Sequence, residues 1–433
     1  MRQFAGSYSP QAGDEFIFKG GDTWPNSDFP LVAEGSGNSS HNDYYGVDPS
    51  WYSGSSFASP TFNAGGANIT GTDPNGSGGK QDILLDLRGR DYITVDDIAF
   101  DNFTASGLTS AYGTCAAIEM VGDQNITINR VSIPSIAMDA TTFHGPNCFG
   151  IEAATYSPYA GNSIVENSYI SGALNSYATG ILCVGNVENS TVDHMIGEVY
   201  PCGHGTISGN LLENCGNPFP AGSSGIHADA IQSDNANGTY YIYNNVIHDT
   251  GADQSAPNEC ESMLIGNPGE TDYVYNNVLY NINGNAISLT QDSSPGVGAY
   301  IWNNSIEGGF AGTAYCVRSG HPATWTTIVI QNNFCASNVS TPTDPGLTAN
   351  TTTTDHNILL RPTQATTDGY ATSSSGFPYQ PPSTGTIPTL GAGTNLSSDC
   401  TGTLLALCTT TSYAGQRNPT SRPSSTPWNA GAY

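Results

Sequence analysis

The stretch TYYIYNNVIHDTG, residues 239–251, is one copy of a repeated unit. Three further copies follow it along the chain: DYVYNNVLYNING (272–284), AYIWNNSIEGGF (299–310) and IVIQNNFCAS (328–337). Each copy alternates apolar and polar residues, as a half-buried strand does, and then turns at Asn-Asn. The first asparagine of this pair recurs after 32, 27 and 29 residues, at Asn244, Asn276, Asn303 and Asn332.

This spacing fits one coil of a parallel β-solenoid made of several short strands. A propeller blade needs about 40–45 residues and therefore ranks second. In stacked coils an asparagine at one turn can form a side-chain amide ladder, so we expect the turns at Asn244, Asn276 and Asn303 to stack. Weaker copies of the unit are YITVDDIAFDNF (92–103), NITINRVSIPSI (125–136) and TISGNLLENCG (206–216).

The repeat and its flanking phrases resemble right-handed parallel β-helix proteins of the pectate-lyase-like superfamily, over about residues 80–360. GDEFIFKGGDTW (13–24) is similar to the segment that opens many secreted bacterial β-helix proteins, and RPSSTPWNAGAY (422–433) to the phrase that closes them. The resemblance implies an all-β fold, a single-stranded right-handed parallel β-helix. We expect an N-terminal cap at 1–80, the β-helix at 81–360 and a C-terminal tail at 361–433 packed along it, since solenoid ends expose strand edges.

Charge is sparse and strongly unbalanced, with 10 Lys and Arg against 37 Asp and Glu and a net charge of −27. Such a chain repels polyanions at long range, which argues against nucleic acid and anionic membranes as partners. No apolar run approaches the roughly 20 residues of a membrane helix, so no membrane insertion is expected. The composition suits neutral ligands or cations.

The ten cysteines form an even, scattered set without metal-ligand spacing. Such a set predicts disulfides formed in an oxidising compartment, and hence a secreted protein. Short loops such as those from Cys400 to Cys408 and from Cys202 to Cys215 are plausible bridges, but the sequence does not give the pairing.

A second strand of each coil lies between the Asn turns. Its copies are AAIEMVG (116–122), FGIEAAT (149–155), TGILCVG (179–185), DAIQSDN (229–235), ESMLIGN (261–267) and NAISLTQ (285–291). The central apolar residues are expected to point inward and the following residues outward, which places Glu152 and Gln232 in the outward column. The same alignment sets Asp229 beside Glu261 of the next coil.

Adjacent parallel strands lie about 4.8 Å apart, and two carboxyl groups at that spacing push their pKa values apart. One protonated and one ionised acid is the arrangement that general acid–base catalysis needs. HADAIQS (227–233) followed by NECESMLIG (258–266) also resembles the polygalacturonase succession of an NTDG-type and a DDC-type phrase, although Glu-Cys-Glu replaces Asp-Asp-Cys. This resemblance implies catalytic roles for Asp229, Glu259 and Glu261, and Asp234 is the nearby fourth candidate.

Other polar residues near the middle coils are candidates for substrate binding. These are His227, Gln232, His248, Glu152 and Arg318. No metal ligands are assigned and no cofactor is required, but an acidic groove could hold Ca²⁺ through oxygen ligands.

Two classes of function remain open. The first is a secreted glycoside hydrolase that acts on a neutral or weakly charged polysaccharide, with a Ca²⁺-dependent polysaccharide lyase as the enzymatic alternative. The second is a non-catalytic β-helix that serves as a surface, adhesion or filament protein. An acid pair facing an open groove favours the enzyme, and buried acids favour the scaffold.

Overall fold

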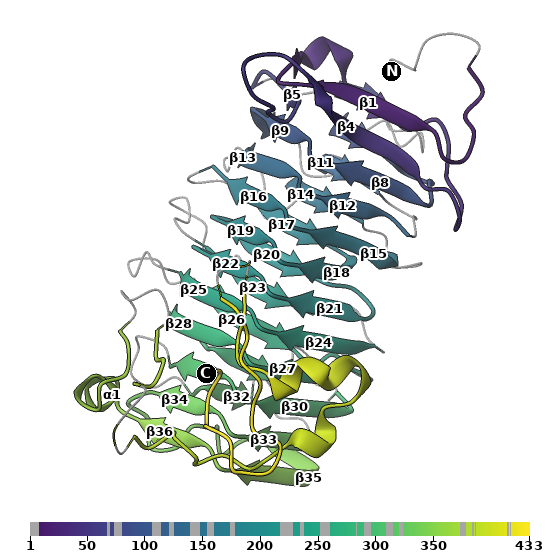
Figure 1. The fold of residues 1–433 in the computed structure, drawn as a ribbon. Coiled ribbons are helices and arrows are strands. Elements are labelled where there is room, and N and C mark those ends of the chain that lie inside the picture. The colour runs from purple at the N-terminus through teal and green to yellow at the C-terminus, as the bar shows by residue number, and fades with distance from the viewer. Residues whose placement is uncertain are drawn as a thin grey trace. The chain divides into compact units, whose positions relative to one another are not determined.

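The computed structural model describes residues 8–66, 70–72, 80–105, 114–120, 125–138, 148–153, 160–173, 178–216, 228–233, 238–251, 260–282, 284–289, 296–308, 315–319, 324–372, 378–382, 385, 387–413, 415 and 417–433. The chain divides into two compact units. Unit 1 comprises Met1–Cys202 and Gly216–His227, and unit 2 comprises Gly203–Cys215 and Ala228–Tyr433. In each unit short strands visit three parallel sheets in turn, which confirms the predicted all-β parallel β-helix (Figure 1).

The strands of unit 1 fall into three sheets, numbered in the order in which the chain first enters them. Sheet 1 contains β1 (Glu15–Gly20), β4 (Asp43–Tyr52), β8 (Ile93–Asp96), β12 (Thr127–Asn129), β15 (Ala160–Glu166) and β18 (Val184–Glu188). Sheet 2 contains β2 (Thr23–Trp24), β5 (Thr61–Asn63), β9 (Ala99–Asp101), β10 (Phe103–Ala105), β13 (Ser132–Met138), β16 (Tyr169–Gly172) and β19 (Thr191–Asp193). Sheet 3 contains β3 (Leu31–Val32), β7 (Lys80–Asp86), β11 (Thr114–Glu119), β14 (Cys148–Glu152), β17 (Ala178–Leu182) and β20 (Gly197–Tyr200), and β6 (Thr70–Thr72) pairs antiparallel with β7 outside this parallel series. Strands of these sheets thus occur from Glu15 onward, within the range expected to form a cap.

The strands of unit 2 follow the same order. Sheet 1 contains β21 (Gly205–Ser208), β24 (Thr239–Tyr243), β27 (Thr271–Tyr275), β30 (Gly298–Trp302), β33 (Thr324–Gln331) and β35 (Thr348–Asp355). Sheet 2 contains β22 (Leu211–Glu213), β25 (Val246–Thr250), β28 (Val278–Ile282), β31 (Ser305–Glu307), β34 (Phe334–Ala336) and β36 (Ile358–Leu360). Sheet 3 contains β23 (Ala228–Gln232), β26 (Cys260–Ile265), β29 (Ile287–Leu289) and β32 (Val317–Ser319).

The helices are few and short. They are α1 (Pro362–Thr367) and three 3₁₀ turns, η1 (Asn26–Asp28), η2 (Ser397–Asp399) and η3 (Gly402–Cys408). Among the described residues, no helix has the length and apolar character needed to cross a membrane.

Apolar columns run through the interior because equivalent residues of successive coils stand opposite one another. In sheet 1 of unit 2 the column is Ile207, Ile242, Val274, Ile301 and Ile330, all buried. In sheet 3 of the same unit Ile231, Met263, Ile287 and Val317 form a second column. Burying a large aliphatic side chain contributes about 1.5–3 kcal/mol, so these columns supply much of the driving force for coil stacking.

The corner after each sheet 1 strand of unit 2 holds a residue in the left-handed region. Asn244, Asn276 and Asn303 have φ values of 57°, 56° and 53°. Asparagine tolerates this conformation better than most residues, which explains the first Asn of each repeat. The backbone N–H of Asn244 donates to the carbonyl of Tyr275, and that of Asn276 to the carbonyl of Trp302. The predicted stacking of these turns is therefore confirmed.

The amide ladder is formed by the second asparagine of each pair. In the series Asn210, Asn245, Asn277, Asn304, Asn333 and Asn357, each side-chain N–H₂ group donates to the next side-chain oxygen at 2.9–3.0 Å. Each of these oxygens also accepts the backbone N–H of the preceding rung. From Asn245 onward, the remaining amide hydrogen reaches a backbone carbonyl one coil back. Every inner rung is thus satisfied on both sides.

Unit 1 uses serine at the equivalent corner. The Ser168 hydroxyl accepts the N–H of Val131, and the Ser190 hydroxyl accepts the N–H of Ser168, each at 3.1 Å. Asn167 and Asn189 precede these serines and are again left-handed, with φ values of 53° and 51°. A hydroxyl has one donor where an amide has two, so the serine version makes fewer bonds per coil.

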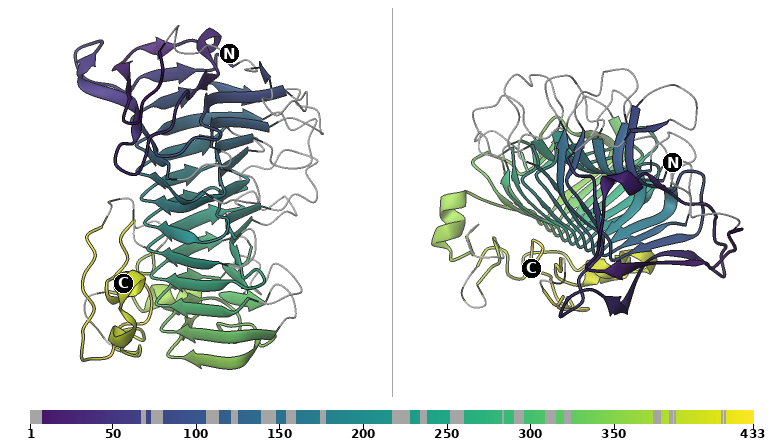
Figure 2. Two further views of the ribbon diagram at one scale, coloured as in Figure 1. Left: turned by 90° about the vertical axis from the view of Figure 1, so that its right-hand side faces the viewer. Right: turned by 90° about the horizontal axis from the view of Figure 1, so that it is seen from above.

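The C-terminal tail packs on unit 2, beside its green strands in Figure 2. The left-handed asparagines hold it in place. The Asn276 amide donates to the carbonyls of Ala406 and Thr409, both at 2.9 Å, and Asn332 exchanges two hydrogen bonds with the backbone of Thr394. One asparagine therefore turns the coil and also binds the tail.

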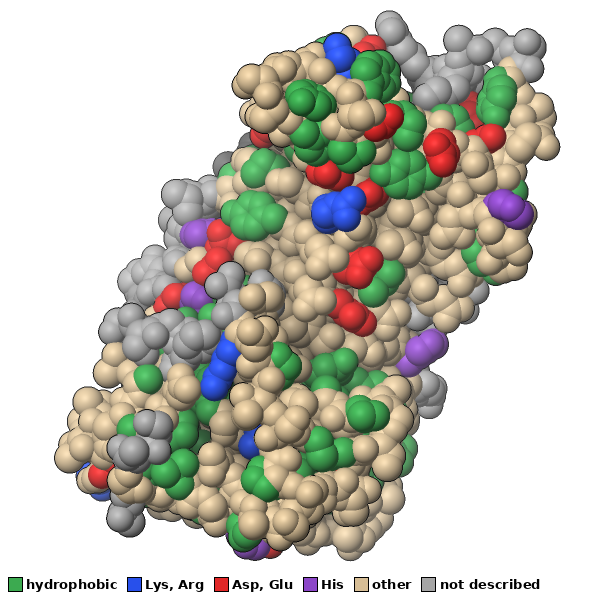
Figure 3. All heavy atoms as spheres, in the orientation of Figure 1, with side chains coloured by type: hydrophobic (Ala, Val, Ile, Leu, Met, Phe, Trp, Pro, Cys, Tyr) green, Lys and Arg blue, Asp and Glu red, His purple; other side chains and the backbone are tan. Residues whose placement is uncertain are grey.

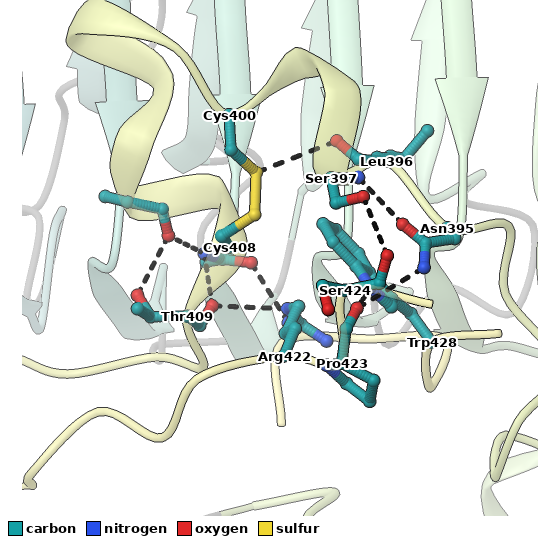
Figure 4. The surroundings of a disulfide bond; sticks show 12 residues. Asn395, Leu396, Ser397, Cys400, Cys408, Thr409, Arg422, Pro423, Ser424 and Trp428 are labelled. Atoms are coloured by element: carbon teal, nitrogen blue, oxygen red, sulfur yellow. Dashed lines mark hydrogen bonds between the residues drawn. A yellow bond between two sulfur atoms is a disulfide. The ribbon is translucent and has the colours of Figure 1, made fainter. Parts of the chain in front are cut away.

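The closing phrase supplies the buried anchors of the tail. Arg422 donates to the Asn276 side-chain oxygen and to the carbonyls of Thr409 and Gly431. Its guanidinium lies 5.4 Å from the ring centroid of Trp428, which is fully buried against Tyr275 and Trp302. Figure 4 shows Arg422, Thr409 and Trp428 in the surroundings of the Cys400–Cys408 disulfide.

All ten cysteines are paired, as predicted. The disulfides are Cys115–Cys148, Cys183–Cys202, Cys215–Cys260, Cys316–Cys335 and Cys400–Cys408. The predicted Cys400–Cys408 bridge is confirmed. The predicted Cys202–Cys215 bridge is wrong, because the sheet register decides proximity and places each of these cysteines beside a different partner.

An acid pair lies in the interior of unit 2 near the corner between sheets 3 and 1. Asp272, on β27, is fully buried and stands between Tyr240 and Ala299 of the neighbouring coils. Glu270 is also fully buried and accepts the Asn267 N–H at 2.7 Å. Among the described residues neither acid forms an ion pair with Lys, Arg or His. Burial, together with the neighbouring Glu270, raises the pKa of Asp272 well above its usual range.

We predict that Asn277→Ala lowers the free energy of unfolding by about 3 kcal/mol or more. The change leaves the backbone N–H and one side-chain hydrogen of Asn245, and the carbonyl of Ile242, without the partners that Asn277 gives them, and each unsatisfied buried group costs about 1–3 kcal/mol. Urea unfolding of the wild type and the variant measures the loss. Exposed Asn42 is the control, where alanine should change stability by less than about 0.5 kcal/mol. Equal losses of unfolding free energy at Asn277 and Asn42 would show that the amide ladder does not stabilise the fold.

We predict that Asp272→Asn gains stability relative to the wild type as pH rises. A raised carboxyl pKa means that the folded state binds more protons than the unfolded state. The wild type therefore loses about 1.4 kcal/mol of stability for each pH unit between the unfolded-state pKa, about 4, and the folded-state pKa. Urea unfolding at pH 4.5 and pH 8 should show the variant gaining on the wild type at pH 8. A stability difference between variant and wild type that stays constant with pH would contradict the raised pKa of Asp272. Replacement of the exposed Asp355 by Asn is the control.

Candidate functional site

Sheet 3 of unit 2 brings Asp229 and Glu261 together. Asp229 on β23 is the register partner of Glu261 on β26, as the alignment of coils predicted. The Asn285 amide of the following coil donates to Glu261 Oε1 at 2.9 Å. Glu261 is partly exposed, whereas Asp229 is fully buried at 0 % exposure. The pair is thus adjacent but differs strongly in solvation.

Two other predicted residues lie on strands of this sheet, Gln232 on β23 and Arg318 on β32. Gln232 is partly exposed and stands opposite Leu264, and exposed Arg318 on β32 stands opposite Ser288. Three predicted residues, His227, Asp234 and Glu259, lie outside the described residues.

His248 lies on sheet 2 instead of sheet 3, so it belongs to a different side of unit 2 from Asp229 and Glu261. Its Nδ1 is 2.7 Å from Asp249 Oδ2, and its Nε2 is 3.3 Å from Glu213 Oε2. The ring stacks on Tyr280 with centroids 4.7 Å apart. The hydrogen bond from His248 lowers the pKa of Asp249. Both ring nitrogens are therefore engaged by carboxylates of the fold.

Sheet 3 of unit 1 carries a second column of acids. Asp86, Glu119 and Glu152 are register partners in successive strands β7, β11 and β14. Arg88 follows β7 and binds Asp86 through two bonds, Nε to Oδ1 at 2.8 Å and Nη2 to Oδ2 at 2.6 Å. Its Nη1 lies 3.6 Å from Glu119 Oε1. One guanidinium thus orients the first two carboxylates.

Glu152 is at the far end of this column from Arg88. It is 8 % exposed, and its Oε2 is buried without a hydrogen-bond partner among the described residues. Burial, with the nearby Glu119 carboxylate, raises the pKa of Glu152 well above its usual range. Neighbouring carboxyl groups with different protonation states are typical of acid–base sites.

Asp86 and Arg88 were not among the predicted site residues, although a signal for them is present in the sequence. Adding DILLDLR (82–88) as one more copy of the sheet 3 strand aligns Asp86 with Glu119 and leaves Arg88 two residues beyond it. Glu152, expected to point outward, is the register partner of Glu119, and both side chains are buried.

No group of three or more His, Cys, Asp and Glu side chains within the described ranges is arranged to hold a metal ion. Binding of Ca²⁺ therefore stays a prediction. Such a site would combine two carboxylates with neutral oxygen ligands.

Comparison with known proteins gives similarity at the level of structure alone. No protein-family model and no curated sequence matches the chain. The GH136 lacto-N-biosidase from Eubacterium ramulus superposes with a TM-score of 0.52 at 12% identity, covering 81% of this chain and 63% of that one. Pectate lyase Pel9A superposes with a TM-score of 0.45 at 13% identity, covering 98% of this chain and 88% of that one.

The chain therefore spans less than two thirds of the length of the lacto-N-biosidase structure. At such low identity the similarity establishes the fold, which is the parallel β-helix expected from the Asn-Asn repeat.

Proposed function

We propose that the protein is a secreted carbohydrate-active enzyme, a glycoside hydrolase that acts on a neutral or weakly charged polysaccharide. The observation that carries the proposal is the register pairing of Asp229 with Glu261 on adjacent strands of sheet 3. Most glycoside hydrolases use a pair of Asp or Glu side chains, and here two such side chains stand on neighbouring coils. The lacto-N-biosidase with the same fold is, by its name, a glycan-cleaving enzyme.

The two acids have different surroundings, which suggests their roles. Asp229, the fully buried member of the pair, is assigned the proton donor. Glu261 is more exposed and is oriented by the Asn285 amide, so it is assigned the base or nucleophile. In this mechanism Asp229 protonates the leaving glycosidic oxygen, while Glu261 activates water or attacks the anomeric carbon.

Charge supports a neutral substrate. The chain has a net charge of −27, and Lys and Arg side chains are sparse on the face shown in Figure 3. A polyuronate would be repelled, and a lyase needs a cation to neutralise the uronate carboxylate. On sheet 3 of unit 2 the described basic residue is Arg318, which stands opposite Ser288, two coils beyond Glu261. The hydrolase is therefore preferred to the lyase.

One observation favours the non-catalytic alternative. Asp229 has no exposed surface, and buried acids are what a purely structural β-helix would show. A catalytic role requires that substrate reach Asp229, whereas a scaffold requires only that the coil be stable. Activity measurements therefore decide between the two.

Secretion is part of the proposal because five disulfides persist best in an oxidising compartment. Their number and placement in both units are typical of an extracellular protein.

We predict that a panel of neutral polysaccharides and polyuronates will include a neutral polysaccharide from which the protein releases reducing ends. Hydrolysis adds water across the glycosidic bond, so no unsaturated product should form. Reducing-end assays and ultraviolet absorbance on the same samples test this directly. Release of unsaturated products from uronates would show a lyase, and inactivity across the panel would support the scaffold.

On an identified substrate, we predict that Asp229→Asn and Glu261→Gln each lower kcat by at least about 10²-fold, as loss of a general acid or base does. Thermal melting should change little, since both replacements keep the side-chain size. Exposed Asp355→Asn on β35 is the matched control and should keep wild-type kinetics. Full activity of both site variants would exclude the pair from catalysis.

A further inference from the structure

The outer face of sheet 1 in unit 2 is uncharged. On the described strands β21, β24, β27, β30 and β33, the outward residues are Thr, Ser, Gly, Tyr, Trp, Val and Gln. The sheet register sets them in columns, and the middle column is Thr206, Tyr241, Tyr273, Tyr300 and Val329. Sheet 1 of unit 1 differs, because Asp96, Glu166 and Glu188 share one of its columns. In a chain with a net charge of −27, such a face fits an uncharged partner.

Three partly exposed tyrosines of the middle column stack on one another, and we call Tyr241, Tyr273 and Tyr300 the tyrosine strip. The ring centroids of Tyr241 and Tyr273 are 5.2 Å apart, and those of Tyr273 and Tyr300 are 4.8 Å apart. The planes of the two pairs lie within 7° and 11° of parallel, so inner ring faces meet other rings. Ring edges and hydroxyl groups are therefore what the strip offers to a ligand.

The hydroxyl groups of the strip differ from that of a neighbouring tyrosine. The Tyr275 hydroxyl, in the next column, donates to the Thr403 carbonyl of the tail at 3.3 Å. None of the three hydroxyl groups of the strip forms a hydrogen bond with another described residue. Burial, together with the neighbouring Tyr300 and Tyr241, raises the pKa of Tyr273, so this hydroxyl keeps the proton that it can donate.

The stack ends at Tyr241. Its register neighbour on the side away from Tyr273 is Thr206, which carries no ring. One face of the Tyr241 ring therefore has no aromatic partner in the stack. Aromatic faces carry partial negative charge and attract C–H groups, so this face suits the C–H side of a sugar ring.

The C-terminal tail, yellow in Figure 1, covers the column beside the strip. Tyr275 and Trp302 of that column are buried together with Trp428 of the tail. Tyr273 and Tyr300 border this cluster but stay partly exposed. The tail thus occupies one side of the face and leaves the strip beside it.

We propose that the tyrosine strip binds an uncharged polysaccharide chain and holds it without cleaving it. Successive strands repeat at about 4.8 Å, so a sugar chain lying along the solenoid meets one tyrosine hydroxyl per coil. The open face of Tyr241 packs on a sugar ring at one end of the strip. The inference rests on the proposed function only for the class of ligand. The strip lies on sheet 1, whereas Asp229 and Glu261 lie on sheet 3.

Periodicity and charge together select this ligand. Hydroxyl groups that recur at one spacing match a polymer of one repeating unit, which a folded protein surface is not. A polyanion is repelled by the net charge of −27. A neutral polysaccharide is both periodic and uncharged, and its hydroxyl groups pair with those of the strip.

Affinity electrophoresis of the full chain tests the strip, in native gels run in the cold to slow any cleavage. The gels contain xyloglucan, galactomannan or mixed-linkage β-glucan as neutral probes, and polygalacturonate as the polyanionic comparison. At least one neutral probe should retard the wild type, and polygalacturonate should not. Replacing all three tyrosines of the strip by Phe keeps the stack but removes the hydroxyl row. The Kd for the retarding probe should then rise at least about fivefold.

Two single variants complete the set. Tyr241→Ala removes the open ring face and should also raise the Kd at least about fivefold. Tyr169→Ala, at an exposed tyrosine on sheet 2 of unit 1, is the matched control and should leave the Kd within about twofold. Thermal melting checks that each variant is folded. If Tyr241→Ala fails to fold, the triple Phe variant decides, because its ring stack is intact.

The inference is overturned if no neutral probe retards the wild type, or if wild type and the triple Phe variant are retarded equally. Equal retardation with a changed oligomeric state in light scattering would make the strip an interface between copies instead. The proposed function fails separately. Retardation of a wild type that hydrolyses no glycan would leave the strip standing and remove the hydrolase. Hydrolysis without retardation would do the reverse.

Discussion

The stacking of coils depends on buried amides that must find partners. In unit 2 each inner ladder asparagine donates twice and accepts twice, and the six rungs run from Asn210 to Asn357. A coil shifted by one residue would bury several of these groups unsatisfied, at about 1–3 kcal/mol each. It would also turn the apolar column through Ile242 and Val274 away from the core. The ladder therefore fixes register more strictly than hydrophobic burial alone.

Fixed register has a direct chemical consequence. Residues at equivalent positions of successive coils become neighbours. One acidic residue at the same position of each of two adjacent repeats therefore creates a carboxyl pair. Asp229 with Glu261 and Glu119 with Glu152 arise in this way. At Glu152, burial together with the neighbouring Glu119 raises the pKa of the carboxyl group. A solenoid can thus acquire acid–base pairs without changing its backbone.

The sequence predicted the parts that repeat and missed the parts that do not. The Asn-Asn spacing predicted the coil, and alignment of the second strand predicted the Asp229–Glu261 neighbourhood. It assigned the stacked turn correctly to Asn244 but could not show that Asn245 forms the ladder, because two adjacent asparagines are equivalent in a pattern. The partner of Cys202 and the burial of Asp229 depend on three-dimensional neighbours. His248 follows the corner at Asn244 and lies on sheet 2, away from the strands that carry Asp229 and Glu261.

Native-state hydrogen exchange tests most directly whether the ladder holds the register. The backbone N–H groups of Asn245, Asn277, Asn304 and Asn333 each donate to the next side-chain oxygen at 2.9–3.0 Å. If the ladder fixes the coils, these amides open only when unit 2 unfolds and should be among its slowest to exchange. Exchange as fast as in the exposed turn at residues 338–341 would contradict the account, because the rungs would then open without loss of the fold.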